Sequence, residues 1–441
     1  MRATQQPAPF LPETLATDPT LQEQFLSPVM QVLQNYVRNT LDCPEMSDAE
    51  FVRLGCRRVL SQARSGRDFL QAEQEQGAAG LKRSNFFAVL HSGRRQALLH
   101  ECAIQLYLEG SRQLLQAGQD LLAAFPLLRG RAVWAVDGHQ IEHACHALKD
   151  PQGRFVGSKS LYLLCLHTGL VHNLCPVQGE GLYRHEMPVF RERLPAWLAQ
   201  QKPSAKTLPP ILVLDPAYVD KQFWTRMKLA SQAGALAITR TKENMKPQRF
   251  GALEWDRQDQ INLGVQAQSR VGFEGSACMR LIEYVDPETG ERYEFLTTEM
   301  DLPPGLIAWL YLLRWRIEKV FDTAKNKLQE TKAWASGTVA QQIQGHFFAL
   351  THNLLVLFRH YLESAHGLKE TKLIRKRDSA LEQRRERAQA AGRQVHPLHA
   401  KMPPVVQLSL QFIRTLRNYI SQGVSLAASI ARFEAMLASY L

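Results

Sequence analysis

Cysteine is scarce in this chain of 441 residues, and its seven cysteines show no pairing pattern. They are odd in number, widely scattered and include no Cys-x-x-Cys pair. Secreted domains that are stabilised by disulfides usually contain an even number of cysteines at characteristic spacings. We therefore expect a protein of a reducing, cytoplasmic compartment.

Long apolar runs are also missing. No apolar stretch precedes Pro7 and Pro9, so we expect no signal peptide. The most apolar run, residues 347–358, is interrupted by His352 and Asn353 and is too short to span a bilayer. These absences predict a soluble protein with no membrane partner.

Three common catalytic motifs are absent. The chain contains no Gly-x-x-x-x-Gly-Lys-Ser/Thr, no Gly-x-Ser-x-Gly and no His-Glu-x-x-His. No motif therefore supports nucleotide-driven, serine-hydrolase or zinc-protease chemistry.

Positive charge is present in excess, and it is unevenly placed. The formal net charge is +11, in a chain long enough for two to four domains. Residues 301–400 hold 16 Lys and Arg against 9 Asp and Glu, and residues 401–441 hold 4 against 1. An anionic partner is therefore expected to lie against the C-terminal part of the chain.

The stretch of residues 311–325 carries the most distinctive pattern. Its polar residues fall at i, i+3, i+7 and i+14, namely Tyr311, Arg314, Glu318 and Lys325. On an α-helix these positions form one stripe, beside an apolar stripe that can pack on a core. We expect this helix to continue as far as residue 335. An ordinary solvent-exposed helix face would give the same pattern, so the stretch alone does not define an enzyme.

Two short apolar runs upstream each stop at an aspartate. Residues 132–136 end at Asp137, and residues 210–214 end at Asp215. Such runs are typical of strands buried on both faces. Taken alone, either aspartate could be only a loop or helix-cap residue.

The elements around these runs predict an α/β protein. Further strands are expected at 160–167, 170–177 and 235–239, and helices at 184–201 and 221–230. The order strand, strand, strand, helix, strand, helix, strand is that of a ribonuclease-H-like fold. In that fold a central strand and its neighbour each end in an acid.

The whole chain is predicted to have four parts. They are a helical N-terminal domain at 1–128, a ribonuclease-H-like core at 129–244 and 303–365, a β-rich insertion at 245–302 with a hairpin of strands 279–285 and 291–298, and a basic segment with C-terminal helices at 366–441. The segment 369–393 could be an exposed helix, a linker or a DNA-contacting arm.

Basic residues occur in clusters along the predicted N-terminal helices. The clusters are Arg57 and Arg58, Arg64 and Arg67, Lys82 and Arg83, and Arg94 and Arg95. They could bind DNA phosphates, or they could be ordinary solvated helix faces.

Tyr311, Arg314, Glu318 and Lys325, at this spacing, resemble the YREK signature of the cut-and-paste DDE transposases of bacterial insertion sequences. The resemblance implies a DNA transposase that binds terminal inverted repeats, cleaves DNA at the element ends and joins the 3′ ends to target DNA. It implies double-stranded DNA as the partner, a homodimer in the DNA complex and a cytoplasmic, nucleoid-associated location. It also implies that residues 1–128 are a DNA-binding domain, that the ribonuclease-H-like core is catalytic and that residues 366–441 serve DNA contact or dimerisation.

The resemblance also implies a catalytic triad of Asp137, Asp215 and Glu318 that holds two Mg²⁺ ions, with Mn²⁺ as a substitute. Hard cations prefer carboxylate oxygens, and a pair of them stabilises both the attacking and the leaving oxygen in phosphoryl transfer. The expected DNA-binding residues are Tyr311, Arg314, Lys325, Arg240, Lys242 and Trp255. In some relatives a tryptophan of the insertion stacks on a flipped base, and Trp255 is ranked before Trp309 for that role.

Several alternatives stay open at this point. The second acid is followed by Pro-Ala-Tyr218, where the family commonly has Arg-Gly-Phe, and this departure bears on the subgroup. A stand-alone ribonuclease-H-like nuclease would cut DNA without joining it, and a non-catalytic transposase-derived inhibitor would only bind DNA. The rival acids are Glu142, Asp150 and Asp220. A zinc site is a weaker alternative for the cluster of His139, His143, Cys145 and His146.

Overall fold

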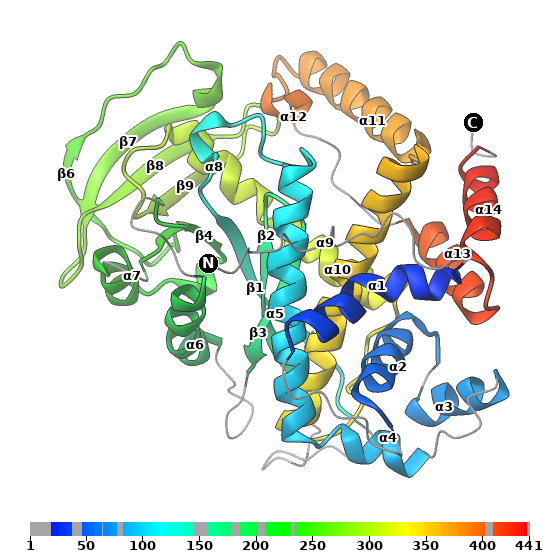
Figure 1. The fold of residues 1–441 in the computed structure, drawn as a ribbon. Helices are drawn as coiled ribbons and strands as arrows, with labels where there is room; N and C mark the ends of the chain where they lie inside the picture. Colours follow the sequence, from blue (N-terminus) through cyan, green and yellow to red (C-terminus); the bar gives the residue numbers. More distant parts are fainter. Residues whose placement is uncertain are drawn as a thin grey trace, which may run out of the picture.

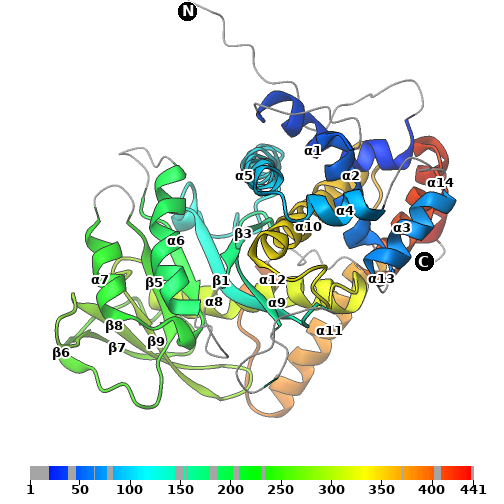
Figure 2. The same cartoon turned by 90° about the horizontal axis from the view of Figure 1, so that it is seen from below.

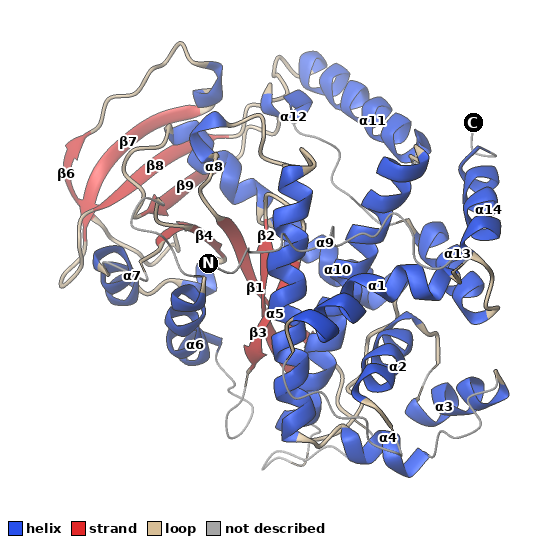
Figure 3. Cartoon of the chain, viewed as in Figure 1, coloured by secondary structure: helices blue, strands red, loops and turns tan. Residues whose placement is uncertain are grey.

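Figure 1 shows the computed structural model, which describes residues 19–37, 46–63, 65–76, 83–144, 153, 157–177, 186–201, 208–230, 234–369, 371–401 and 409–438. A strand-rich half and a helical half lie side by side (Figure 3). Some residues singled out from the sequence lie outside the described residues: Arg64, Lys82, Cys145, His146 and Asp150.

The N-terminal part is helical, as its caps and periodicity predict. Its helices are α1 (Leu21–Asn35), α2 (Asp48–Leu60), α3 (Gly66–Glu75), α4 (Arg83–Val89) and α5 (Gly93–Gln116). Ser47 accepts a hydrogen bond from the amide of Glu50 at the start of α2, and Thr20 forms a full capping box with Glu23 at the start of α1. A short 3₁₀ turn, η1 (Pro126–Leu128), leads into the sheet.

The first five strands have the predicted order. They are β1 (Val133–Ile141), β2 (Ser158–Cys165), β3 (Val171–Pro176), β4 (Ile211–Leu214) and β5 (Leu236–Arg240), with α6 (Glu186–Gln200) before β4 and α7 (Lys221–Leu229) after it. β1, β2 and β3 pair antiparallel, whereas β4 pairs parallel with both β1 and β5. This arrangement, with a central strand beside a parallel neighbour, confirms the predicted ribonuclease-H-like core. In Figure 2, α6 and α7 lie on one side of the sheet.

Residues 248–297 form four more strands, and these extend the same sheet. They are β6 (Gln248–Ala252), β7 (Val265–Gly272), β8 (Met279–Val285) and β9 (Arg292–Thr297), with η3 (Gln260–Asn262) between β6 and β7. The predicted hairpin is β8 and β9. Since β9 pairs antiparallel with β5, the sheet has nine strands in the order β3-β2-β1-β4-β5-β9-β8-β7-β6. The β-rich insertion is therefore continuous with the core sheet.

The signature stretch differs from the single helix that its spacing predicts. α8 (Pro304–Leu313) ends before Arg314, α9 (Trp315–Asp322) follows, and a π-helical turn, η4 (Thr323–Lys327), closes the stretch. The helix therefore stops well before residue 335. The change of pitch also means that residues after 322 no longer follow the 3.6-residue stripe.

The remaining helices form the C-terminal half. They are α10 (Thr338–His366), α11 (Thr371–Ala390), α12 (Leu398–Lys401), α13 (Leu410–Ser421) and α14 (Leu426–Ala438). Within the basic segment 369–393, residues 371–390 form α11, whose described side chains are mostly exposed, so this part is a helix and not a flexible linker. In the described part of the chain, no helix has the length and apolarity needed to cross a bilayer.

α10 is the central helix of the molecule. It packs on α1, α2 and α5 from the N-terminal part and on β3 of the sheet, and most of its side chains are buried. The ring of Phe347 fills the space beside Gly55 on α2, where a Cβ atom would collide with it. Burial on all sides explains why α10 is strongly apolar although it spans no membrane.

The N-terminal basic clusters are largely used within the protein. Arg57 forms an ion pair with Glu73 at 2.8 Å, and the Arg58 guanidinium lies over the rings of Phe69 and Trp334. Arg94 and Arg95 both form ion pairs with the buried Asp48. These four arginines therefore stabilise the helical packing, and that they also bind DNA phosphates stays a prediction.

The contact between Gly55 and Phe347 makes a stability prediction. Gly55→Ala should lower the free energy of unfolding by about 1–3 kcal/mol, because the added methyl group displaces a fully buried ring. Urea unfolding followed by circular dichroism measures the change. Gly93→Ala is the matched control, because a Cβ atom at the start of α5 meets nothing within 4 Å. Equal effects of the two substitutions would contradict the packing described here.

Candidate active site

One guanidinium group joins the three acids singled out from the sequence. Arg314 Nη1 donates to Asp137 Oδ2 at 3.2 Å, and Arg314 Nη2 donates to Glu318 Oε1 at 2.9 Å. Nη2 also lies 3.6 Å from Asp215 Oδ2. The Arg314 side chain is 7% exposed, whereas the carboxylates are 23–36% exposed. The three acids therefore converge at the edge of a buried cation, facing solvent.

Sheet register explains why the two aspartates meet. β1 and β4 are parallel neighbours, and Val136 lies opposite Leu214. The next residue of each strand is an aspartate, so Asp137 and Asp215 reach the same edge of the sheet. Asp215 Oδ1 also accepts from the amide of Ala217, which caps the 3₁₀ turn η2 (Pro216–Tyr218) and fixes the chain direction after the strand.

Asp137 does not end its strand, contrary to the sequence prediction. β1 continues to Ile141 and pairs with β2 along its whole length, with Asp137 opposite Tyr162. The apolar run of residues 132–136 stops because one face of β1 is exposed to solvent from Asp137 onward. Its backbone hydrogen bonds continue through Gly138, His139 and Gln140, which carry no apolar signal.

The break between α8 and α9 places Arg314. α8 is buried on nearly all its residues, and Pro304 occupies its first position, where a missing amide hydrogen costs nothing. The amide of Arg314 donates to the carbonyl of Tyr311, which tightens the last turn. Glu318 lies one turn further along α9, so Arg314 reaches it as an i, i+4 partner.

The electrostatics of the site reflect a crowded set of carboxylates. The pKa of Asp137 is raised from 3.8 to about 6, mainly by burial, and the charges of Glu186 and Asp215 add to this effect, while the hydrogen bond from Gly138 and the charge of Arg314 oppose it. Burial alone would lower the pKa of Arg314, but Tyr311 and the three carboxylates outweigh this effect and the pKa is raised. The site therefore holds more negative charge than its one buried cation neutralises.

Glu186 is a fourth acid that sequence reasoning missed. It begins α6 and forms an ion pair with Lys159 of β2. Its carboxylate lies against Gly138, where any Cβ atom would collide with it. Nothing in the local sequence marks Glu186, because only the packing of α6 against the sheet brings it beside Asp137.

The expected DNA-binding residues differ in how near they lie to the triad. Tyr311 is buried, with its ring 5.8 Å from the Arg314 guanidinium, and burial raises its pKa. Arg240 ends β5, is exposed and acts electrostatically on Tyr311. Lys325 is exposed on the π-helical turn, and its charge acts on His139 of β1. Lys242 is exposed two residues beyond β5, with no contact to the triad that the structure records.

The tryptophans that could stack on a DNA base differ in how far they are exposed to solvent. Trp309 is 3% exposed and packs against His396 and His399, so it belongs to the core. Trp255 is partly exposed, with the Arg257 guanidinium 4.8 Å from its ring centre. Trp315, next to Arg314, is 56% exposed, and sequence reasoning assigned it no role. Helical periodicity in the sequence does not predict that Trp315 is exposed while the neighbouring Arg314 is buried.

The alternative sites gain no support. His139 stacks on Phe321, and burial lowers its pKa to about 4, which is typical of a neutral core histidine. Asp220 caps α7 and forms an ion pair with Arg191, while Glu142 is exposed beyond the end of β1. Within the described ranges no group of three or more His, Cys, Asp or Glu side chains is arranged to hold a metal ion.

Comparisons with known proteins found a family and a solved structure that resemble the chain. Residues 129–354 match the family model described as "Transposase DDE domain". A solved structure titled "Cryo-EM structure of piggyBac transposase synaptic complex with hairpin DNA (SNHP)" aligns over 93% of this chain and 80% of its own, with 9% identity and a TM-score of 0.38. A likeness at that score carries no weight here. No curated protein matches the chain.

The raised pKa of Asp137 predicts a pH-dependent gain from Asp137→Asn. Because the folded protein binds this proton more tightly than the unfolded chain does, the free energy of unfolding falls as pH rises from about 4 to about 6 and stays lower above. Asp137→Asn removes this cost. Urea unfolding should show the variant about 1–3 kcal/mol more stable than the parent protein at pH 7.5, and no more stable near pH 3.5.

Asp378→Asn on the exposed face of α11 is the control and should change stability little at either pH. If Asp137→Asn destabilises the protein at pH 7.5, or stabilises it equally at both pH values, the carboxylate is not held at an energetic cost.

Proposed function

The chain belongs to the DDE transposase family, and we propose that it binds the terminal repeats of its element, cleaves DNA at the element ends and joins the freed 3′ ends to target DNA. The observation that carries the proposal is the convergence of Asp137, Asp215 and Glu318 on Arg314. Residues from β1, β4 and α9 meet there at the solvent-facing edge of the sheet.

The donor set fits a hard divalent cation. Asp137, Asp215 and Glu318 offer only carboxylate oxygens, which Mg²⁺ and Mn²⁺ prefer, and no thiol or imidazole competes among them. We propose that these three residues hold the metal, with Arg314 supplying positive charge to them in its absence. Two bound ions would stabilise charge on the attacking and leaving oxygens of an in-line displacement at phosphorus.

The reaction itself needs little covalent chemistry from the protein. In cleavage, a water oxygen bonds to phosphorus while the bond to the 3′ oxygen breaks, which leaves a 3′ hydroxyl and a 5′ phosphate. In joining, that 3′ hydroxyl attacks a target phosphodiester, and the target's own 3′ oxygen leaves. The residues of the site position the phosphate and balance its charge, which is the larger part of catalysis for such reactions.

Side chains around the triad are proposed to hold the DNA. Arg240 and Lys325 are exposed cations near Tyr311 and β1, and they suit phosphates on either side of the scissile bond. Trp315 presents an exposed ring next to Arg314 and suits stacking against a base or sugar. Lys242 and Trp255 are proposed to contact DNA further along the insertion.

Both ends of an element must be processed together, so we propose that two copies of the chain assemble on DNA. Each copy would then supply one complete triad. The exposed helix α11 is a proposed surface for this assembly. Arg384 of α11 makes a bidentate contact with Glu288 in the turn between β8 and β9, which holds the helix against the rest of the chain.

Removal of any one acid tests the proposal. Asp137→Asn, Asp215→Asn and Glu318→Gln should each lower cleavage of a labelled terminal-repeat duplex by roughly 10²–10³-fold or more while leaving its gel shift intact, since each replaces a carboxylate that is proposed to hold the metal with a neutral amide. EDTA should abolish cleavage, and added Mg²⁺ or Mn²⁺ should restore it.

Glu142→Gln is the matched control, because Glu142 is an exposed acid of the same sheet with no contact to Arg314. Normal cleavage by any of the three triad variants would refute the assignment. A cut product without a joined product would instead indicate a nuclease, and a shifted band without cutting would indicate a DNA-binding inhibitor.

A further inference from the structure

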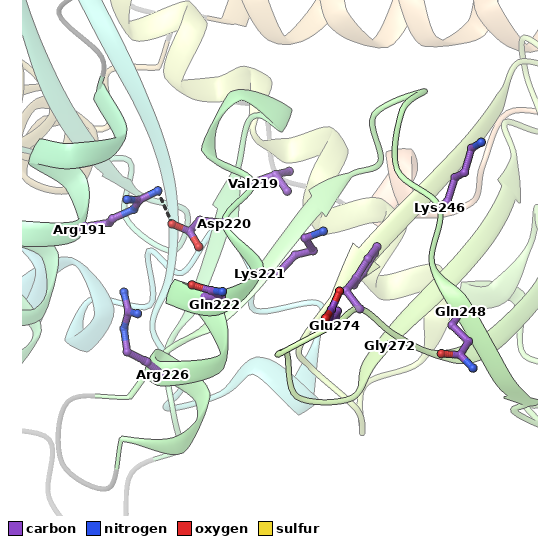
Figure 4. A pocket seen from close by; sticks show the side chains of 11 residues that line it. Arg191, Val219, Asp220, Lys221, Gln222, Arg226, Lys246, Gln248, Gly272 and Glu274 are labelled. Atoms are coloured by element: carbon purple, nitrogen blue, oxygen red, sulfur yellow. Dashed lines mark ion pairs between the residues drawn. The ribbon is translucent and has the colours of Figure 1, made fainter.

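A cleft of about 780 Å³ opens between α7 and the β6–β7 side of the sheet (Figure 4). Its charged lining residues are Arg191, Asp220, Lys221, Arg226, Lys246 and Glu274. Figure 4 shows Arg191 and Arg226 on one side, Lys246 on the other and Lys221 between them. Cations therefore line both walls.

The charges of the cleft are only partly neutralised. Arg191 forms an ion pair with Asp220 at 2.5 Å. Among the residues that the structure describes, no carboxylate lies within 4 Å of the cationic nitrogens of Lys221, Arg226 or Lys246, the distance at which an ion pair forms. The Lys221 ammonium lies 4.3 Å from the ring centre of Phe273. Three cations thus face one remaining acid, which favours an anionic occupant.

The walls of the cleft are held together by hydrogen bonds. The amide of Ala277 donates to Thr225 Oγ1 of α7 at 2.9 Å, and Lys228 Nζ donates to the carbonyl of Cys278 at 3.2 Å. These contacts fix the loop after β7 against α7. The cleft is therefore already formed without a ligand, and binding does not have to order its walls.

An exposed aromatic ring lies at the edge of the cleft. Phe250 of β6 is 61% exposed, and its ring covers Gly272, which lines the cleft. Basic side chains next to an exposed ring are typical of nucleic-acid surfaces, because the cations bind phosphates and the ring contacts bases or sugars.

The position of the cleft relates it to the active site. Val219 lines the cleft and is four residues after Asp215, so their Cα atoms are at most about 14 Å apart. The N-terminal helices α1 to α4 lie on the opposite side of the molecule from β6 (Figure 2). DNA held in the cleft would therefore approach the triad from the side of the molecule away from those helices.

We propose that this cleft binds the backbone of target DNA and presents it to the triad for joining. The proposal rests on the proposed function, because only a joining reaction needs a second duplex at the site. Lys221, Arg226 and Lys246 bind phosphates of the target strand, and Phe250 contacts a sugar or base beside them. Contacts to phosphates make the binding independent of target sequence.

Lys246→Glu and Arg226→Glu, made singly, test this assignment. Each variant is given terminal-repeat duplexes together with a separate supercoiled plasmid, and cleavage and joining are measured in the same reaction with Mg²⁺. End cleavage should stay within about twofold of the parent protein, and joining to the plasmid should fall by about tenfold or more. For a 30-base-pair duplex of arbitrary sequence, the plot of log affinity against log salt should become less steep by about one unit.

Arg129→Glu is the matched control. Arg129 is exposed and precedes β1, so it lies at the opposite end of the parallel strands from Asp137. This control should join and bind DNA as the parent protein does.

Joining by Lys246→Glu at the level of Arg129→Glu would overturn the proposal. A parallel fall in cleavage and joining would also overturn it, because the cleft would then hold the element end. If the parent protein cleaves nothing, the proposed function fails separately. Affinity for the arbitrary duplex, compared between Lys246→Glu and Arg129→Glu, then still decides whether the cleft binds DNA.

Discussion

The ion-pair cluster around Arg314 is the interaction on which the rest of the structure depends. A buried guanidinium has to be paired, and here one group satisfies carboxylates from β1, β4 and α9 at the same time. Because three carboxylates share the guanidinium, the loss of any one of them still leaves Arg314 paired. The parallel register of β1 with β4 and the break between α8 and α9 are the two structural features that bring these groups within reach of one another.

The same cluster links stability to function. Burial and neighbouring carboxylates raise the pKa of Asp137, so ionising it in the empty site costs free energy. A bound cation, or the positive side chains around a DNA phosphate, would stabilise the ionised form of Asp137 in the complex and offset this free energy. The nine-stranded sheet supports this arrangement, because β9 joins the insertion to β5 and carries the basic cleft close to the end of β4. A site strained without its ligands is expected where charge has to be preorganised.

Sequence reasoning recovered what local chemistry encodes. Continuous apolar runs predicted the central strands, and the identities and spacing of Asp137, Asp215 and Glu318 indicated which acids to examine. Sequence reasoning failed where tertiary contacts determine the length of an element or the position of a side chain. β1 continues past Asp137 because β2 pairs with it, the signature helix breaks between Leu313 and Trp315, and Glu186 reaches the site only through the packing of α6. The ion pairs of Arg57, Arg94 and Arg95 could not be predicted for the same reason, because their acidic partners are distant in sequence.

The most direct test of the central claim is an anomalous difference map from crystals of the protein bound to terminal-repeat DNA and grown with Mn²⁺. The account predicts manganese peaks among the carboxylates of Asp137, Asp215 and Glu318, with the Arg314 guanidinium displaced from between them. Manganese bound elsewhere, or carboxylates still closed on Arg314 with DNA in place, would contradict it.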